Sequence, residues 1–199
     1  MKKGIVLACL VISVLFIAVC AFAGKAATEK QIALEQKPQG VVDDLQDIKN
    51  PDAGFKVDLW VDREDATYKV GDEVAFFFKT NKDCRLTLFN VGTSGKVHIF
   101  FPNKYQEDNL VKAGKAYRYP AEEAKYLFRI KGPAGVDLVK AIATLDDVTL
   151  VASADTKPQG EVKEVVKPQS ELAKDIEIAL KPVKTKKWSE AEMALIVQE

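Results

Sequence analysis

The chain has one histidine, His98, and this limits the chemistry that the sequence can support. Any Cys–His or Ser–His–Asp site would have to use it. We expect a hairpin whose turn is centred between Thr93 and Ser94. His98 then pairs with Phe89, five residues along the same strand from Cys84. Five residues span roughly 16 Å and reverse the face of the strand, so the sequence predicts no Cys84–His98 dyad and an outward-facing His98.

Carboxylates are numerous, but their spacing matches no known site. Asp62, Glu64 and Asp65 share one predicted loop, and Asp146 and Asp147 share another. Paired acids can serve hydrolysis or bind calcium, which needs six to eight converging oxygens. These spacings form no EF-hand, and a zinc site lacks its Cys and His ligands. We interpret the acids as solvated loop residues and expect no metal and no cofactor.

Aromatic side chains are the remaining candidates for a binding site. Trp60 and Phe77 fall opposite the apolar stripes of their predicted strands, and three tyrosines follow. We expect these rings to cover the second face of a sheet or to pack under neighbouring segments. Exposed instead, they would mark a site for a protein partner or a glycan. The candidate binding residues are Trp60, Phe77, Tyr105, Tyr117 and Tyr119.

The elements that must position these residues are short strands of alternating character. Successive side chains of a strand point to opposite faces, so period-2 alternation predicts strands with one buried face. A nearly apolar stretch, Val136 to Thr144, suits a central strand covered on both faces. Alternation from Ala191 to Val197 predicts a last strand, with a helix as the alternative. The apolar stripes are Phe55, Val57, Leu59 and Val61; Val74, Phe76 and Phe78; Leu86 and Leu88; and Val97, Ile99 and Phe101. They predict a mainly β fold, an antiparallel β-sandwich of general immunoglobulin-like architecture.

The first 23 residues have the pattern of a secretory signal peptide. Two lysines follow Met1, Ile5 to Val19 is almost wholly apolar, and small residues occupy positions 21 and 23. We expect cleavage after Ala23 and a periplasmic or secreted protein. The alternative is a lipoprotein anchored at Cys20, although Val19 is larger than the residue that usually precedes a lipidated cysteine.

Charge and cysteine content indicate which kinds of binding and which kinds of stabilisation the protein can use. Lys and Arg together number 29, as do Asp and Glu, and both signs are interleaved. Nucleic-acid binding usually leaves a clustered positive footprint, so the composition argues against that class. Removal of the leader would leave Cys84 as the one cysteine, so no internal disulfide is expected and the domain must be held by its core. We interpret Cys84 as a small buried apolar residue.

The expected organisation has three parts. Residues 1–23 are the signal peptide, 24–54 an N-terminal arm or linker with short helices, and 55–199 the β-sandwich domain. A charged insertion at about 155–169, rich in Lys, Glu, Gln and Pro, is expected to be a surface loop. A short helix is predicted near residues 170–176.

Short motifs in the predicted domain resemble those of a known family. Tyr68 to Val74 resembles the Y-x-x-G-D-x-V element of the domain of unknown function 4384 family, and later pieces follow in the family's order. The resemblance covers Phe55 to about Thr144, and more loosely the segment from Trp188 to Val197. It implies a β-sandwich-like domain of bacterial envelope and signalling proteins, and no reaction. The motif residues that it implies to be structural are Tyr68, Gly71, Asp72, Gly95, Pro102, Asn103, Gly132 and Gly135.

These observations together predict an exported, non-catalytic binding domain of the bacterial cell envelope. A protein partner is the first expectation, and a carbohydrate- or peptidoglycan-binding module is the alternative. An envelope hydrolase is a more distant alternative. No nucleic-acid partner is expected, and membrane contact is expected only if Cys20 is lipidated.

Overall fold

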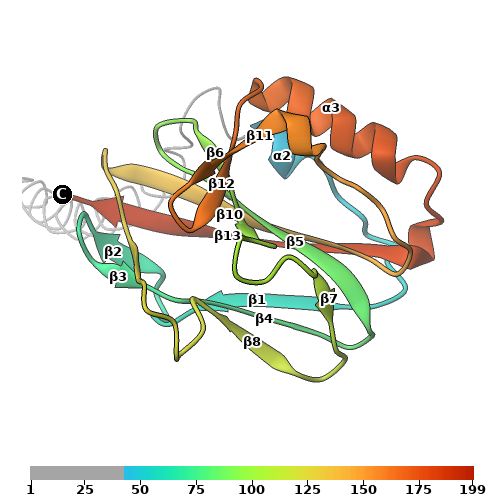
Figure 1. Ribbon diagram of the computed structural model, residues 1–199, viewed down its shortest axis with the longest axis horizontal. Coiled ribbons are helices and arrows are strands. Elements are labelled where there is room, and N and C mark those ends of the chain that lie inside the picture. The colour runs from blue at the N-terminus through green and yellow to red at the C-terminus, as the bar shows by residue number, and fades with distance from the viewer. Residues whose placement is uncertain (1–42) are drawn as a thin grey trace, which may run out of the picture. The chain divides into compact units, whose positions relative to one another are not determined.

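Figure 1 shows a computed structural model of the chain, which describes residues 43–199. The predicted signal peptide, Cys20 and the first part of the predicted arm lie outside the described residues. The described residues fold as one compact unit. They are mainly β, with few and short helices, and form the sandwich-like arrangement of antiparallel sheets that the alternation predicted.

A large sheet of eight strands runs through the middle of the described domain. Its order is β11-β12-β6-β5-β10-β13-β2, and β7 also pairs with β5. Neighbouring pairs are antiparallel except β13 and β2, which are parallel. The strands are β2 (Thr67–Lys69), β5 (Cys84–Val91), β6 (Val97–Phe101), β7 (Leu110–Val111), β10 (Gly135–Thr144), β11 (Thr156–Gln159), β12 (Val162–Val165) and β13 (Trp188–Gln198).

Two smaller sheets and two α-helices complete the described part. β1 (Val57–Val61), β4 (Phe76–Thr80) and β8 (Ala116–Tyr119) form a three-stranded antiparallel sheet, and β3 (Glu73–Val74) pairs with β9 (Phe128–Arg129). The helices are α2 (Asp43–Gln46) and α3 (Gln169–Leu180), with short 3-10 turns at Ser153–Asp155 and Thr185–Lys187. Figure 1 shows α2 and α3 on one side of the large sheet and the three-stranded sheet on the other.

Each face of the large sheet buries its own hydrophobic cluster. Alternate residues of β10 serve the two sides: Val139 and Ala141 join the cluster under the three-stranded sheet, and Leu138 and Ile142 join the cluster under the helices. This is the pattern expected of a strand covered on both faces, as the sequence predicted for Val136 to Thr144. The predicted last strand is also confirmed, since β13 pairs with β10 along ten residues.

The hairpin register predicted from the sequence is wrong by one residue. Gly92 N–H donates to the carbonyl of Lys96, so the loop is one residue longer than assumed and His98 pairs with Asn90 instead of Phe89. Further along, Leu88 pairs with Phe101 while Phe89 pairs with Ile99, which marks a bulge at Phe100.

The bulge changes which face the β6 side chains occupy. Val97 and Ile99 lie in the cluster under the helices, whereas Phe101 lies in the cluster under the three-stranded sheet. The single apolar stripe predicted for Val97, Ile99 and Phe101 is therefore wrong.

The charged insertion is a hairpin, not the surface loop predicted. β11 and β12 pair antiparallel from Thr156↔Val165 to Gln159↔Val162, and β12 joins the edge of β6. The helix predicted near residues 170–176 is present as the longer α3, whose buried face comprises Leu172, Ala173, Ile176 and Leu180.

Residues 43–54, which the sequence places in the arm, pack onto the large sheet. Leu45 and Ile48 are buried in the cluster under the helices, and the Asn50 side chain donates to the carbonyls of Thr185 and Trp188. The folded part of the chain thus includes residues before Phe55. Within residues 43–199, no helix has the length and apolar character needed to span a bilayer.

Candidate ligand-binding cavity

A cavity of about 600 Å³ lies at one end of the large sheet, on the face turned toward the three-stranded sheet. Its floor comes from β5, β6, β10 and β13. Its walls come from the loop 92–96, the segment 127–132 and the tip of the β11–β12 hairpin. Pockets of roughly 300–1,000 Å³ with mostly apolar walls and a few polar groups are typical of ligand sites. The apolar lining consists of Val74, Phe76, Phe100, Leu127, Phe128, Ile130, Val162 and Leu195.

Three polar side chains from adjacent strands form the polar part of the floor: His98 of β6, Asn90 of β5 and Asp137 of β10. Asn90 Nδ2 donates to Asp137 Oδ2 at 3.4 Å, and the Thr93 amide donates to Asp137 Oδ1 at 2.7 Å. His98 Nε2 lies 3.2 Å from Oε1 of Gln159, so in this arrangement Nε2 carries the hydrogen.

Burial shifts the pKa values of the two titratable groups in the cavity floor, Asp137 and His98, in opposite directions. Desolvation raises the pKa of Asp137, although the hydrogen bonds from Thr93 and Asn90 oppose it. Desolvation lowers the pKa of His98, against the raising effects of Gln159 and Glu164. Both shifts disfavour the charged form, as expected for groups removed from water. Perturbed groups in a cleft are typical of functional sites.

Aromatic rings supply much of the apolar wall. Phe100 stacks on Phe128 with ring centroids 4.7 Å apart, and Phe76 lies 5.0 Å from Phe100. Phe100 lies two residues from His98 and therefore on the same face of β6, and the bulge brings Phe101 to that face as well.

The mouth carries exposed charges, most of them paired. Lys96 Nζ is 3.7 Å from Glu164, Arg129 is 2.8 Å from Glu73, and Lys104 is 2.9 Å from Glu161. These exposed pairs contribute little to stability. They set the charge pattern around the opening.

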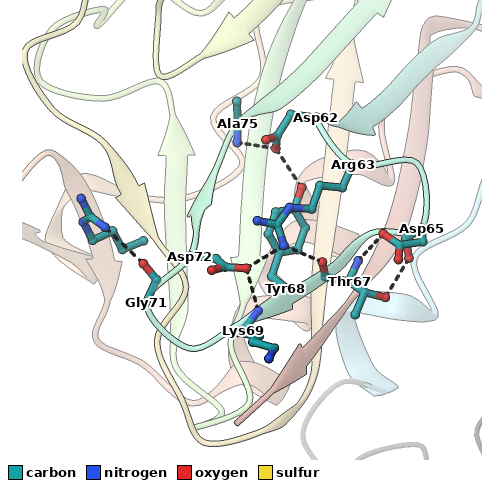
Figure 2. Close-up of polar contacts among 10 residues, drawn as sticks. Asp62, Arg63, Asp65, Thr67, Tyr68, Lys69, Gly71, Asp72 and Ala75 are labelled. Carbon is teal, nitrogen blue, oxygen red and sulfur yellow. Dashed lines mark hydrogen bonds and ion pairs between the residues drawn. The ribbon is translucent and has the colours of Figure 1, made fainter.

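The family motif, Tyr68 to Val74, lies beside this cavity and forms hydrogen bonds to part of the cavity wall. Figure 2 shows its first contact, in which the buried Tyr68 hydroxyl donates to Asp62 Oδ1 at 2.8 Å. The same oxygen accepts the Ala75 amide at 2.9 Å. Burial, then the hydrogen bond to Asp62, raises the pKa of Tyr68, so the phenol stays protonated and donates.

Asp72 forms the second contact of the motif (Figure 2). Its Oδ2 accepts the Lys69 amide at 3.0 Å and Arg63 Nη1 at 2.6 Å. The backbone hydrogen bond from Lys69, then the bond from Arg63, lowers the pKa of Asp72. The Arg63 guanidinium also lies over the Tyr68 ring, 4.5 Å from its centroid, so both contacts share one arginine.

Gly71 joins the motif to the cavity wall. Its φ of +94° is a conformation that favours glycine. Its amide donates to the Ile130 carbonyl, its carbonyl accepts Arg129 Nη1, and the Ile130 amide donates to the Asp72 carbonyl. The segment 127–132 is thereby fixed to the turn that carries Tyr68 and Asp72.

The other motif residues occupy turns. Gly95 has φ +78° in the β5–β6 loop, Gly132 lies against Val70, and Pro102 follows β6. Asn103 is buried and accepts the amides of Tyr105 and Gln106. At Gly135, with φ +151°, a Cβ would lie 2.9 Å from the Thr93 side chain, so glycine permits the close approach that brings the Thr93 amide near Asp137.

The five candidate binding aromatics do not come together, and none lines the cavity. Trp60, 37% exposed, stacks on Phe77 on the outer face of the three-stranded sheet. Tyr119 is buried in the core and Tyr117 packs against it, stacked on Phe78. Tyr105 is exposed elsewhere and stacks on Tyr126.

His98 is not the outward strand residue predicted, since it is half-buried in the cavity floor. The corrected register also turns it to the same face as Cys84, not the opposite one. Asn90, its partner, is six residues from Cys84, which corresponds to about 20 Å. Cys84 is buried, and desolvation raises the pKa of its thiol.

The predicted loop acids are exposed, but several have structural partners. Asp62 accepts the hydroxyl of Tyr68, Asp146 pairs with Lys187, and Asp147 pairs with Arg85. Within residues 43–199 no three His, Cys, Asp or Glu side chains are grouped so as to hold a metal ion.

Asp137 and Asn90 were not predicted as site residues from the sequence. The local signal for Asp137 was its place as the one acid in the apolar run from Val136 to Thr144. Asn90 had no such signal, because its neighbour Asp137 comes from a strand 47 residues later in the chain.

Residues 67–147 match the family model described as Domain of unknown function (DUF4384). No curated protein and no solved structure matches the chain. The matched residues include the Tyr68 motif, the cavity floor as far as Asp137, and most of the wall. This match confirms the family resemblance that the motifs predicted.

Proposed function

We propose that this chain is an exported, non-catalytic binding domain of the bacterial cell envelope and that it engages a protein partner through the cavity floored by Asn90, His98 and Asp137. The observation that carries the proposal is the cavity itself, about 600 Å³ with aromatic walls and a small set of polar groups at its floor. Such a pocket can take an anchoring side chain of a partner, the arrangement in which a few buried contacts dominate affinity. The leader pattern of residues 1–23 supports the compartment.

Exposed apolar residues beside the mouth favour a protein over a free small molecule. Leu127 lines the opening and is 54% exposed, and Val70, which contacts Gly132 of the wall, is 45% exposed. A small ligand in the cavity would leave these side chains in water. A protein surface laid over the mouth would cover them, in the usual pattern of an apolar centre with a charged rim.

A cavity-filling variant tests the proposal. Val162→Trp places a large ring in the lining of the cavity, and Ile178→Trp places the same ring on the exposed side of α3 as the matched control. Immobilised wild type and Ile178→Trp should retain the same envelope protein from a membrane and periplasm extract, and Val162→Trp should lose it. Retention by Val162→Trp at the wild-type level, with an unchanged circular dichroism spectrum, would contradict the proposal.

A second candidate, a carbohydrate- or peptidoglycan-binding module, is favoured by the outer face of the three-stranded sheet. Trp60, Phe77 and Arg118 stand in one row across β1, β4 and β8. The first two rings are stacked, with centroids 5.6 Å apart and nearly parallel planes. The exposed ring of Trp60 can stack on a sugar. Binding to a glycan array that is lost in Trp60→Ala and kept in Val162→Trp would favour this candidate.

A further inference from the structure

We infer that the cavity recognises a positively charged nitrogen of the partner, carried by a lysine or arginine side chain or by an amino terminus, and that Asp137 is the residue that binds it. The inference rests on the proposed function and adds the chemical class of the group that enters the cavity. It is carried by the position, burial and hydrogen bonding of one carboxylate.

Asp137 lies in the cavity lining and is only 7% exposed. Its two hydrogen-bond donors, the Thr93 amide and the Asn90 side-chain amide, are both neutral. An ionised carboxylate can accept about four hydrogen bonds, so two of its acceptor positions are left for a ligand. Because the Asp137 carboxylate lines the cavity, a ligand in the cavity can donate to these two acceptor positions.

The fold provides Asp137 with no counter-charge. No ion pair within residues 43–199 includes it, although nine lysines in that part of the chain pair with other acids. A buried charge without a partner is costly. Three residues further along β10, Lys140 is fully buried but lies 3.4 Å from Glu190 and 3.0 Å from Glu192. The same strand thus carries one neutralised buried charge and one that a cationic ligand would neutralise.

The rest of the floor accepts hydrogen bonds without adding positive charge. Because burial lowers the pKa of His98, its ring is neutral at pH 7. With Nε2 directed to Gln159, its Nδ1 is an acceptor. Asn90 donates its amide hydrogen to Asp137 and keeps its oxygen as an acceptor. An ammonium or guanidinium, which only donates, matches this floor.

The walls suit the stem of such a side chain. Phe100 and Phe128 present a stacked aromatic surface on one side. Aliphatic stems of lysine and arginine pack on apolar surface while the charged end reaches a polar group. Aromatic faces also attract cations.

Cations at the mouth do not cancel this preference. Lys96, Arg129 and Lys131 are exposed, and the first two pair with Glu164 and Glu73. Exposed charges are screened by salt within about 10 Å. Asp137 is buried, where charge interactions are several times stronger.

Amide NMR with small probes tests the inference. The full chain, expressed with its own leader and purified in the form that the host produces, is labelled with ¹⁵N. It is titrated separately with the blocked methylamides of acetyl-lysine and acetyl-arginine and with glycinamide, which carries a free amino group. Acetyl-norleucine methylamide is the neutral control. The chemical shift of the Thr93 amide reports binding at Asp137, because this amide donates directly to the Asp137 carboxylate.

At least one cationic probe should shift the Thr93 amide saturably, and the norleucine probe should not. The responding probe identifies the source as lysine, arginine or an amino terminus. Asp137→Asn should weaken binding at least about tenfold, a loss of about 1.4 kcal/mol or more. The matched control Asp147→Asn, an exposed acid outside the lining, should bind as the wild type does.

Equal binding of lysine and norleucine probes, no response at Thr93 to any probe, or unchanged binding in Asp137→Asn would each overturn the inference. The comparison between probes uses the wild type alone and so does not depend on how a variant folds. If the probes fail while Val162→Trp still abolishes partner capture, the proposed function stands and this inference falls.

Discussion

Asp62 joins two segments of the chain through one oxygen. It accepts the Tyr68 hydroxyl and the Ala75 amide, so a buried phenol and a strand-edge amide are both satisfied by an exposed loop residue. Buried polar groups that lose such a partner carry the full cost of desolvation. The contact therefore explains why a tyrosine, and not a phenylalanine, suits this position of the motif.

Tyr68→Phe should destabilise the domain by about 1.5–3 kcal/mol, the usual range for a hydrogen bond to a charged group. The substitution removes only the hydroxyl, and Asp62 keeps its bond from Ala75. Urea unfolding followed by circular dichroism measures the change. Tyr105→Phe, at an exposed position, should stay within about 0.5 kcal/mol of the wild type. Equal stability of the two variants would show that the Tyr68–Asp62 bond contributes nothing.

His98 should make stability fall as the pH drops below 6.5. Burial lowers its pKa from the ordinary 6.5, with Lys96 and Lys131 acting in the same direction and Gln159 and Glu164 opposing. The unfolded chain therefore binds a proton at a pH where the folded chain does not, and stability is lost as the pH falls through that window. Asp137, on the same floor, has a raised pKa, so the folded chain holds its proton more tightly than the unfolded chain and its contribution to stability changes with pH in the opposite sense.

Urea unfolding at a series of pH values measures this loss, and His98→Asn should reduce it. Because the sequence has one histidine, the imidazole NMR signal reports its pKa directly. A measured pKa at or above 6.5 would contradict the prediction.

At the scale of elements, α3 shows how a helix covers one face of the large sheet. Leu172, Ala173, Ile176 and Leu180 follow helical spacing and are all buried. Ile178, two residues from Ile176, points away and is 67% exposed. The helix is therefore held by packing of one stripe.

Ile176→Ala should lower the free energy of unfolding by about 2–5 kcal/mol, because it leaves a void in the cluster under the helices. Ile178→Ala makes the same chemical change on the exposed side and should stay within about 0.5 kcal/mol of the wild type. Chemical denaturation of both variants measures the difference. Similar losses for the two would mean that α3 does not pack by this stripe.

Strand positions were predictable from the sequence because most strands bury one face. The alternation in β1, β4 and β13 is visible in the residue types alone. The faces of β6 were not, since the extra residue at Phe100 shifts the phase in the middle of the strand. The β11–β12 hairpin also gave no apolar pattern: Lys157 and Glu164 face each other across it, 3.2 Å apart.

The cavity could not be predicted from the sequence for a different reason. Its lining runs from Val74 to Leu195 and comes from segments that only the sheet order brings together. The predicted aromatics were selected by their ring type and face on single strands. That information places Trp60 and Phe77 on an outer face, but it says nothing of neighbours from distant strands.

At the scale of the whole molecule, the leader gives a prediction about processing. The protein recovered from the envelope fraction of an expressing bacterium should begin at Gly24, because residues 21 and 23 are small and follow an apolar run. Intact-mass spectrometry measures this, and Cys20→Ala should leave the product unchanged in its starting residue. A lipid-modified amino terminus at Cys20 would show the alternative, a lipoprotein.

β13, the last eleven-residue strand of the described domain, lies inside the large sheet, with β10 on one side and β2 on the other. The large sheet therefore lacks the strand between β10 and β2 until residues 188–198 have been synthesised. The nascent chain is therefore still incompletely folded during most of its synthesis. For a protein that leaves the cytosol, as proposed, this delay matches the needs of a narrow translocation channel, which passes extended chains more readily than folded ones.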